Sequence, residues 1–394
     1  MSDNEIVFLS GARTAIGGYG GTLAGFAPID LATIATKAAI ERAGIDADKI
    51  GTVVFGHVIN TETRDMYLGR VAMLNAGIPN TATAMNVNRL CGSGAQAIVS
   101  AAQALTLGDA DFAVAGGAEV MSRGAYNVPS LRFGARMGDT KVIDMMVGAL
   151  TCPMGTGHMG ITAENVAEED HISREDQDAF ALESQTRAAA AIEAGHFKSQ
   201  IVPVEVKTRK GTTIFDTDEH PRMTTLEKLA ALRPAFKRDG GTVTAGNASG
   251  INDAAAALVL ARADAAKAAG AKPIARLLGY AIAGVRPEVM GFGPIPACRQ
   301  LFEKTGLTAD DFDVIESNEA FAVQSLAVSR QLGLNPAKVN PNGGAIALGH
   351  PVGATGAILT VKAIYELQRI GGTKALVTMC IGGGQGIALA LELV

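Results

Sequence analysis

The chain has 394 residues, 48% of them hydrophobic, and a formal net charge of −5. This content is enough for a large packed core, and the length suits two or three domains or one large α/β unit with an insertion. The negative charge argues against a general affinity for nucleic acid. No basic and apolar leader precedes the first residues, and no apolar run is long enough to cross a bilayer, so we expect a soluble cytoplasmic protein without membrane contacts.

The four cysteines are too sparse for a disulfide framework, so we expect reduced thiols in a reducing compartment. Two of them, Cys91 and Cys380, lie among glycines. A packing cysteine does not need glycine neighbours. A reacting cysteine benefits from them, because glycine lets backbone N–H groups and a substrate come close.

Short apolar runs alternate with alanine-rich stretches, which predicts an α/β fold with mainly buried sheets. The predicted helices are Leu31 to Ala43 and Ala95 to Leu107. The predicted strands are Ile6 to Leu9, Thr52 to Phe55, Phe112 to Ala115, Leu258 to Leu260, Val314 to Ile315 and Ala375 to Met379.

One pattern occurs twice. Residues 86–88 (NVN) precede Cys91, a helix, a strand and glycines. Residues 340–342 (NPN) precede His350, the helix Ala354 to Ile370, a strand and glycines. The repeated order predicts a duplicated α/β unit, in which Cys91 and His350 occupy equivalent places before a long helix. Two such units related by a pseudo-twofold axis would bring both residues to one central site; a chance likeness between glycine-rich halves is the alternative.

The stretch between the repeats is less regular and richer in charge. We expect an N-terminal half of residues 1–120 plus 249–270, an inserted loop domain of residues 121–248, and a C-terminal half of residues 271–394. Within the insertion, Ser173 is the expected N-cap of a helix that runs to Ala194. An insertion of this length is usually functional.

Cys91 lies just before a predicted helix, where free N–H groups and the helix dipole favour a thiolate. We expect residues 92–94 (GSG) to leave space for an acyl group and to offer N–H groups to an oxyanion. The alternative is a buried structural cysteine. His350, between Gly349 and Pro351, is expected in a tight turn, where it would accept and return the thiol proton. Its alternative is a core histidine.

Cys380 follows a strand and precedes three glycines, a suitable place for a second thiol that acts as acid and base. The Gly382 N–H group could join that of Cys91 in an anion pocket. A redox pair with Cys91 is the alternative. Asn318 could hold a water or a carbonyl oxygen, and Glu319 could orient a neighbouring side chain. The alternative is that residues 318–321 (NEAF) simply begin a helix.

These motifs resemble those of the thiolases along essentially the whole chain. The matching segments are 88–94 (NRLCGSG), 247–253 (NASGIND), 318–322 (NEAFA), 343–351 (GGAIALGHP) and 380–386 (CIGGGQG). The last segment resembles the biosynthetic branch, which comprises acetyl-CoA acetyltransferases and β-ketothiolases. The resemblance implies duplicated αβαβα layered halves and a reversible Claisen condensation of acyl-CoA with acetyl-CoA to 3-ketoacyl-CoA and CoA.

The resemblance also implies roles. Cys91 would be the acylated nucleophile, His350 its base, and Cys380 the base that removes the α-proton. Asn318, through a water, and His350 would form one oxyanion hole, and the N–H groups of Cys91 and Gly382 the other. Coenzyme A would be a substrate rather than a permanent cofactor, held by His158, Met159, Arg222, Ser249, Ala320 and Phe321.

Two departures from the family pattern stand out. Ser317 stands where the family more often has a small apolar residue. The segment Thr224 to Lys228 is one residue shorter than the family pattern, with a lysine near the position of the serine that usually contacts CoA. His158 and His171 lack a ligand set, so no metal is expected. Family members are commonly dimers or tetramers, and we expect a homotetramer, with the segment Met121 to Asp144 as a candidate contact.

Two rival functions remain. The first is a decarboxylating condensing enzyme related to ketoacyl synthases. By resemblance, enzymes of that class have a Cys-His-His site, whereas the third residue of the site here is Cys380. A non-catalytic acyl-CoA or lipid-binding module would have no need to keep Cys91, His350 and Cys380 together. Thiol-dependent cleavage of acetoacetyl-CoA distinguishes these possibilities.

Overall fold

The first part of the chain alternates strands and helices, as seen in a computed structural model that describes residues 5–209 and 211–394. Strands β3 and β4 pair in parallel, as do β3 and β5, and β12 lies antiparallel between β5 and β1. No helix in these two ranges is both long and apolar enough to span a membrane. The elements are β1 (Ile6–Arg13), α1 (Pro28–Ala43), β3 (Ile50–Gly56), α2 (Leu68–Asn75), β4 (Thr83–Val87), α3 (Ser93–Leu107), β5 (Phe112–Val120) and β12 (Asn252–Arg262), with the short β2 (Gly17–Gly18) and α8 (Ala263–Ala268) beside them.

The last part of the chain repeats this arrangement. Strands β14 and β15 are parallel, and β16 lies antiparallel between β15 and β13. Its elements are β13 (Ala275–Gly284), α9 (Pro294–Thr305), β14 (Val314–Ser317), α10 (Ala322–Leu332), α11 (Ala345–Leu348), α12 (Thr355–Ile370), β15 (Lys374–Ile381) and β16 (Gln385–Leu393).

The two units join along β1 and β13, which pair antiparallel. The strand order of the whole sheet is β14-β15-β16-β13-β1-β12-β5-β3-β4. Counted outward from β1 and β13, the strands of the two units follow in the same order. In the place that β4 occupies in the first unit, the second unit has only a parallel bridge between Ile315 and Val339. The α/β fold with duplicated halves predicted from the sequence is therefore confirmed.

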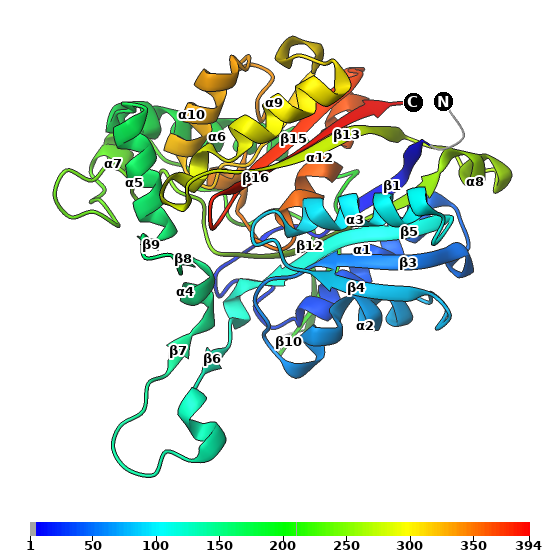
Figure 1. Ribbon diagram of the computed structural model, residues 1–394, viewed down its shortest axis with the longest axis horizontal. Coiled ribbons are helices and arrows are strands. Elements are labelled where there is room, and N and C mark those ends of the chain that lie inside the picture. The colour runs from blue at the N-terminus through cyan, green and yellow to red at the C-terminus, as the bar shows by residue number, and fades with distance from the viewer. Residues whose placement is uncertain (1–4, 210) are drawn as a thin grey trace.

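Helices α3 and α12 form the middle layer, because they pack on each other and touch strands of both units. Helices α1 and α2 cover the outer side of one unit, and α9 and α10 cover the outer side of the other (Figure 1). The contact between the central helices is reciprocal. A Cβ added at Gly94 would lie 2.6 Å from the Ala357 nitrogen, and one added at Gly356 would lie 2.2 Å from the Ala95 nitrogen. Glycine at both positions lets the two backbones touch.

Residues 121–251 leave the sheet after β5 and return to it at β12. An arm that contains β6 and β7 and ends in the loop between them projects from the body at the lower left of Figure 1. Helices α5 and α6 of this segment pack against the second unit through contacts of α5 with α10 and of α6 with α10 and α11, whereas Gln200 and Asp218 bond to Arg13 of the first unit. Its elements are β6 (Tyr126–Asn127), β7 (Ile143–Asp144), α4 (Met145–Ala149), β8 (Thr151–Cys152), β9 (Gly157–His158), α5 (Met159–Glu169), α6 (Arg174–Glu193), β10 (Val204–Thr208), β11 (Gly211–Phe215) and α7 (Leu226–Ala230).

The predicted elements lie within the observed ones, but the strands are longer. Strand β12 includes the alanine run Ala254–Ala257, a composition that does not signal a strand. It forms one because it is fully buried between β1 and β5, where small side chains fit beneath α1 and α12. The helix predicted from Ser173 is α6, and the Ser173 hydroxyl accepts from the Asp176 N–H group at 3.0 Å.

Replacing Gly356 by alanine is expected to destabilise the protein by about 1–3 kcal/mol or more, because the new methyl group would overlap the α3 backbone. Urea unfolding of the purified variant measures this change. Gly148→Ala in α4 is the matched control, since nothing lies within 4 Å of its added Cβ. Equal stability of the two variants would contradict the close crossing of α3 and α12.

Candidate active site

A cavity of about 750 Å³ lies between the ends of the parallel strands and the inserted segment. Cys380 and Asn318 are buried and do not line it. The other residues predicted for the site do line it: Cys91, His158, Met159, Arg222, Ser249, Ala320, Phe321, His350 and Gly382. The fold therefore brings together side chains from both repeats and from the insertion.

Cys91 lies in a tight turn between β4 and α3. The preceding residue, Leu90, has φ 46°, a left-handed conformation that strains a branched side chain. The Ser93 hydroxyl stabilises the turn, since it donates to the Leu90 carbonyl at 2.7 Å and accepts from the Arg89 N–H group at 2.9 Å. These bonds hold the partly exposed Cys91 at the cavity wall.

The glycines beside Cys91 serve packing rather than an acyl group, which corrects the expectation from sequence. A Cβ on Gly92 would lie 2.5 Å from Cδ1 of Ile381 in β15, and one on Gly94 would meet the α12 backbone. Their absent side chains let the second repeat approach, so that the two thiols come near each other.

The protonation expected for Cys91 is also corrected. Burial raises the pKa of its thiol; hydrogen bonds from the backbone of Gly382 and of Cys91 itself oppose this, and the Glu119 carboxylate adds to it. The cost of burying a charge therefore outweighs the helix terminus. Cys91 is therefore a thiol and needs a base to react.

His350 is held as a neutral base. Its N–H group donates to Oδ1 of Asn252 at 3.0 Å, which fixes the turn before α12. Its Nδ1 lies 2.7 Å from the Thr355 hydroxyl, which itself donates to the Pro351 carbonyl. Nδ1 must then carry the hydrogen, so Nε2 presents a lone pair. Burial lowers the pKa of His350 to about 4.

Cys380 ends β15 just behind the cavity. Burial raises the pKa of its thiol strongly, and the neighbouring Cys91 raises it further. The surroundings of Cys380 therefore do not lower its pKa towards neutrality. A thiol with a raised pKa still exchanges a proton with another thiol, because its thiolate is a strong base.

Asn318 follows β14, the parallel neighbour of β15. Its Nδ2 lies 3.5 Å from Nε2 of His350, at the outer limit of a hydrogen bond. Its Oδ1 is buried without a partner among the described residues, a position suited to a water. Glu319 faces away, since its oxygens accept from Ser184 and Asn340 side chains. Ser317 is also buried away from the cavity.

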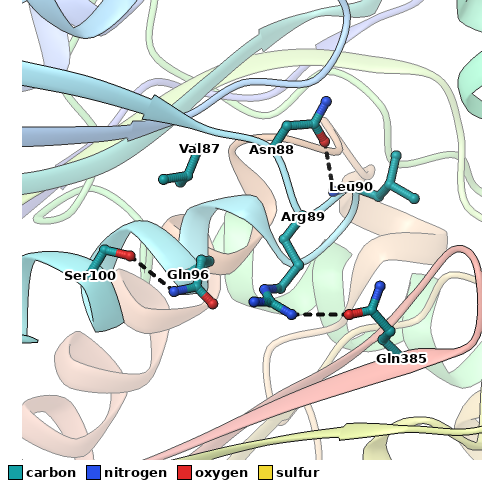
Figure 2. Close-up of a pocket in the computed structure, with 7 residues that line it drawn as sticks. All are labelled: Val87, Asn88, Arg89, Leu90, Gln96, Ser100 and Gln385. Atoms are coloured by element: carbon teal, nitrogen blue, oxygen red, sulfur yellow. Dashed lines mark hydrogen bonds between the residues drawn. The ribbon is translucent and has the colours of Figure 1, made fainter.

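A hydrogen bond joins the loops that carry the two cysteines. Figure 2 shows a second cavity, of about 580 Å³, on the far side of the Cys91 turn. There the Arg89 guanidinium donates to Oε1 of Gln385 at 3.0 Å. Arg89 lies just before Cys91, and Gln385 follows the glycines after Cys380, so this bond holds both loops together.

Aromatic rings form the wall opposite Cys91. The His158 ring stacks on Phe236, with centroids 4.7 Å apart, and Phe236 meets Phe321 edge-on at 6.3 Å. His158 Nδ1 accepts from the Gly160 N–H group and so caps α5. Phe236 did not stand out in the sequence, because an isolated aromatic in an irregular stretch carries no motif.

The rim of the cavity is basic on one side. Arg222 is exposed there, and its guanidinium has no hydrogen bond or ion pair within the described ranges. In the segment that departs from the family pattern, Thr224 lines the cavity, whereas Lys228 is exposed outside it. The described residues contain no group of three His, Cys, Asp or Glu side chains arranged to hold a metal ion.

Family models match both halves of the chain. The model of the thiolase N-terminal domain matches residues 6–264, and that of the thiolase C-terminal domain matches residues 271–393. The chain is 59% identical to the beta-ketothiolase BktB of Cupriavidus necator, over 98% of this chain and 99% of that protein. It is 50% identical to the acetyl-CoA acetyltransferase of Escherichia coli, over 98% of both chains.

Solved structures agree. The acetyl-CoA acetyltransferase of Bacillus anthracis superposes with a TM-score of 0.96 at 45% identity, covering 99% of both chains. The human mitochondrial 3-ketoacyl-CoA thiolase in complex with CoA gives a TM-score of 0.96 at 43% identity, covering 100% of this chain and 99% of that one. The resemblance inferred from the motifs is thus confirmed, and the chain belongs to the thiolase family.

Proposed function

We propose that this protein is an acyltransferase that reversibly condenses two acetyl-CoA molecules, or an acyl-CoA and acetyl-CoA, to 3-ketoacyl-CoA and CoA. The observation that carries the proposal is that the Cys91 thiol and the neutral His350 imidazole line one cavity, with the buried Cys380 thiol close to Cys91. The names and titles of the relatives, which include acetyl-CoA acetyltransferase and 3-ketoacyl-CoA thiolase, support the same activity.

The first step is acyl transfer to Cys91. The thiol proton passes to Nε2 of His350 as the sulfur attacks the thioester carbonyl. The N–H groups of Cys91 and Gly382 receive the oxyanion, and each well-placed donor lowers such a barrier by roughly 3–4 kcal/mol. Cys380 gives its proton to the departing CoA sulfur. The acyl-enzyme then holds an imidazolium and a thiolate, with no net change in charge.

The second step forms the carbon–carbon bond. The Cys380 thiolate removes the α-proton of acetyl-CoA, while the His350 imidazolium and a water on Asn318 stabilise the enolate oxygen. The enolate attacks the acyl carbonyl, and the Cys91 sulfur leaves and regains its proton from His350. Both thiols end as they began, so the cycle is balanced and also runs in reverse as thiolysis.

Coenzyme A would enter as substrate along the wall built by the insertion. The apolar side chains of Met159, Ala320 and Phe321 suit the pantetheine arm, and His158 and Ser249 offer polar contacts. The exposed Arg222 suits a phosphate of the nucleotide. In this proposal residues 121–248 act as an inserted unit, while residues 249–270 belong with the N-terminal half because β12 lies between β1 and β5.

We further propose a cytoplasmic homotetramer. All four cysteines are free, which suits a reducing compartment. The outer side of β4 has no strand partner in the described ranges, so β4 is the expected dimer contact. The arm between β6 and β7 exposes Leu131, Phe133 and Met137, which suits contacts between dimers.

Variants of the two cysteines separate the steps. Cys91→Ala is expected to form no acetyl-enzyme with labelled acetyl-CoA, because the nucleophile is absent. Cys380→Ala is expected to acetylate Cys91 but to lose condensation by about a thousandfold or more, because no base removes the α-proton. Protein-bound label and acetoacetyl-CoA formation measure the two steps. Cys298→Ala, a buried cysteine remote from the cavity, is the control and keeps both. Normal condensation by Cys380→Ala would contradict the proposal.

The pH dependence of acylation tests the role of His350. Its pKa, about 4, lies below the ordinary value, so the imidazole stays an unprotonated base until the pH falls through about 4. The rate of acetyl-Cys91 formation is therefore expected to show no histidine limb between pH 5 and 7, in single-turnover experiments with circular dichroism as the check on folding. An acid limb centred near pH 6.5 would contradict a buried neutral base.

Substitutions in the arm test the assembly. The double variant Phe133→Ser with Met137→Ser is expected to turn tetramers into dimers, because both apolar side chains are more than nine-tenths exposed in the isolated chain. Light scattering gives the mass. Leu107→Ser, which replaces another well-exposed apolar residue at the end of α3, is the control and keeps the tetramer. An unchanged mass for the double variant would reject this contact.

A further inference from the structure

The mechanism leaves one buried carboxylate near Cys91 unused. Glu119, on β5, is fully buried. Its Oε2 accepts from the N–H groups of Val58 at 3.1 Å and Gly353 at 2.9 Å, and its Oε1 accepts from that of Ile59 at 3.1 Å. Nδ1 of His57 lies 3.3 Å from the same Oε1.

Burial raises the pKa of the Glu119 carboxyl, whereas His57 and the backbone hydrogen bonds that it accepts lower it. We take Glu119 as ionised because its hydrogen-bond partners can only donate. The three backbone groups can only donate. His57 Nδ1 donates to the Ala118 carbonyl at 2.9 Å, since that oxygen can only accept, so the nitrogen beside Glu119 carries a hydrogen. A protonated carboxyl would have no acceptor here. Glu119 is therefore a buried negative charge bound by donors alone.

The bonds of Glu119 reach both repeats. Val58 and Ile59 follow β3, whereas Gly353 belongs to the turn that carries His350 into α12. This turn fits closely, since a Cβ on Gly353 would lie 2.5 Å from Glu119 Oε2. Ile59 also belongs to the apolar cluster that packs against Cys91. Glu119 therefore connects the base, the nucleophile and the two halves.

The charge of Glu119 also acts on the thiol. Burial is the largest cause of the raised pKa of Cys91, and the Glu119 carboxylate raises this pKa further. His350 and Cys380 are the other titratable groups near Cys91, and both are neutral. His57 faces Glu119, with Asp65 3.8 Å beyond its Nε2.

We propose that Glu119 is a positioning residue that holds the His350 turn against the Cys91 loop, and that its charge, in addition to burial, opposes a free thiolate at Cys91 until a substrate and His350 take the proton. Glu119 would thus suppress a free thiolate, which alkylating and oxidising agents attack. This inference rests on the proposed role of Cys91 as the nucleophile.

Two variants separate position from charge. Glu119→Gln is expected to increase iodoacetamide labelling of Cys91 severalfold at neutral pH and to move its pH midpoint lower. Thiolysis of acetoacetyl-CoA should fall about a hundredfold, because the turn shifts. Glu119→Asp keeps the charge but draws back from Gly353, so its labelling midpoint should stay near that of the wild type while kcat falls about tenfold. Peptide mass spectrometry assigns the labelled cysteine.

Glu164→Gln is the matched control. Glu164 is also buried and accepts from the backbone of Thr242 and Val243, but it lies on α5 away from Cys91. Its labelling midpoint should equal that of the wild type. An unmoved midpoint in Glu119→Gln, or the same shift in Glu164→Gln, would overturn the role of the charge. If Glu119→Gln does not fold, a wild-type kcat in Glu119→Asp overturns the positioning role.

Labelling requires no turnover. A wild-type protein without thiolysis would therefore reject the proposed function, while the labelling comparison would still test Glu119.

Discussion

The contact between α3 and α12 determines the geometry of the site. Gly94 and Gly356 let the two helix backbones touch, each glycine facing the residue after its counterpart. The turns before these helices carry Cys91 and His350, so the distance between the helices sets the distance between the proposed nucleophile and its proposed base. The same approach brings β15, and with it Cys380, beneath the Cys91 turn, as the contact between Gly92 and Ile381 illustrates. A larger residue at the crossing would separate the repeats and their chemical groups together.

Burial then determines the charge state of these groups. It raises the pKa of both thiols and lowers that of His350, so these three groups are a neutral acid, a neutral base and a second neutral acid. Charge appears only when protons move between them, and it then appears as a pair of opposite sign. Such a pair costs less in an apolar site than a single charge, and it stabilises an enolate more strongly than neutral donors would. A resting site without a thiolate is also less exposed to oxidation.

Much of this arrangement was predictable from the sequence, and the reasons for the failures are physical. The motifs NVN and NPN, each before a turn and a helix, predicted that Cys91 and His350 lie at one site, because such short motifs can be recognised in the sequence itself. The alanine-rich β12 was only partly predicted, since its strand conformation comes from neighbours on both sides. The glycines around Cys91 were interpreted as room for substrate, although they make room for α12 and β15. The prediction of a thiolate at Cys91 was wrong, because burial raises the pKa of this thiol more than the helix terminus lowers it. Phe236 and Glu119 carry no local pattern, and only tertiary structure brings them to the site.

The central claim is that one substrate reaches both sulfurs at once. A short bis-electrophile such as 1,3-dibromoacetone tests it most directly, with the reduced wild-type protein as the target and peptide mapping as the measurement. The account predicts a single bridge that joins the peptides containing Cys91 and Cys380, while Cys152 and Cys298 remain unmodified. Separate single adducts on Cys91 and Cys380, with no bridged peptide, would show that the two thiols do not share a site.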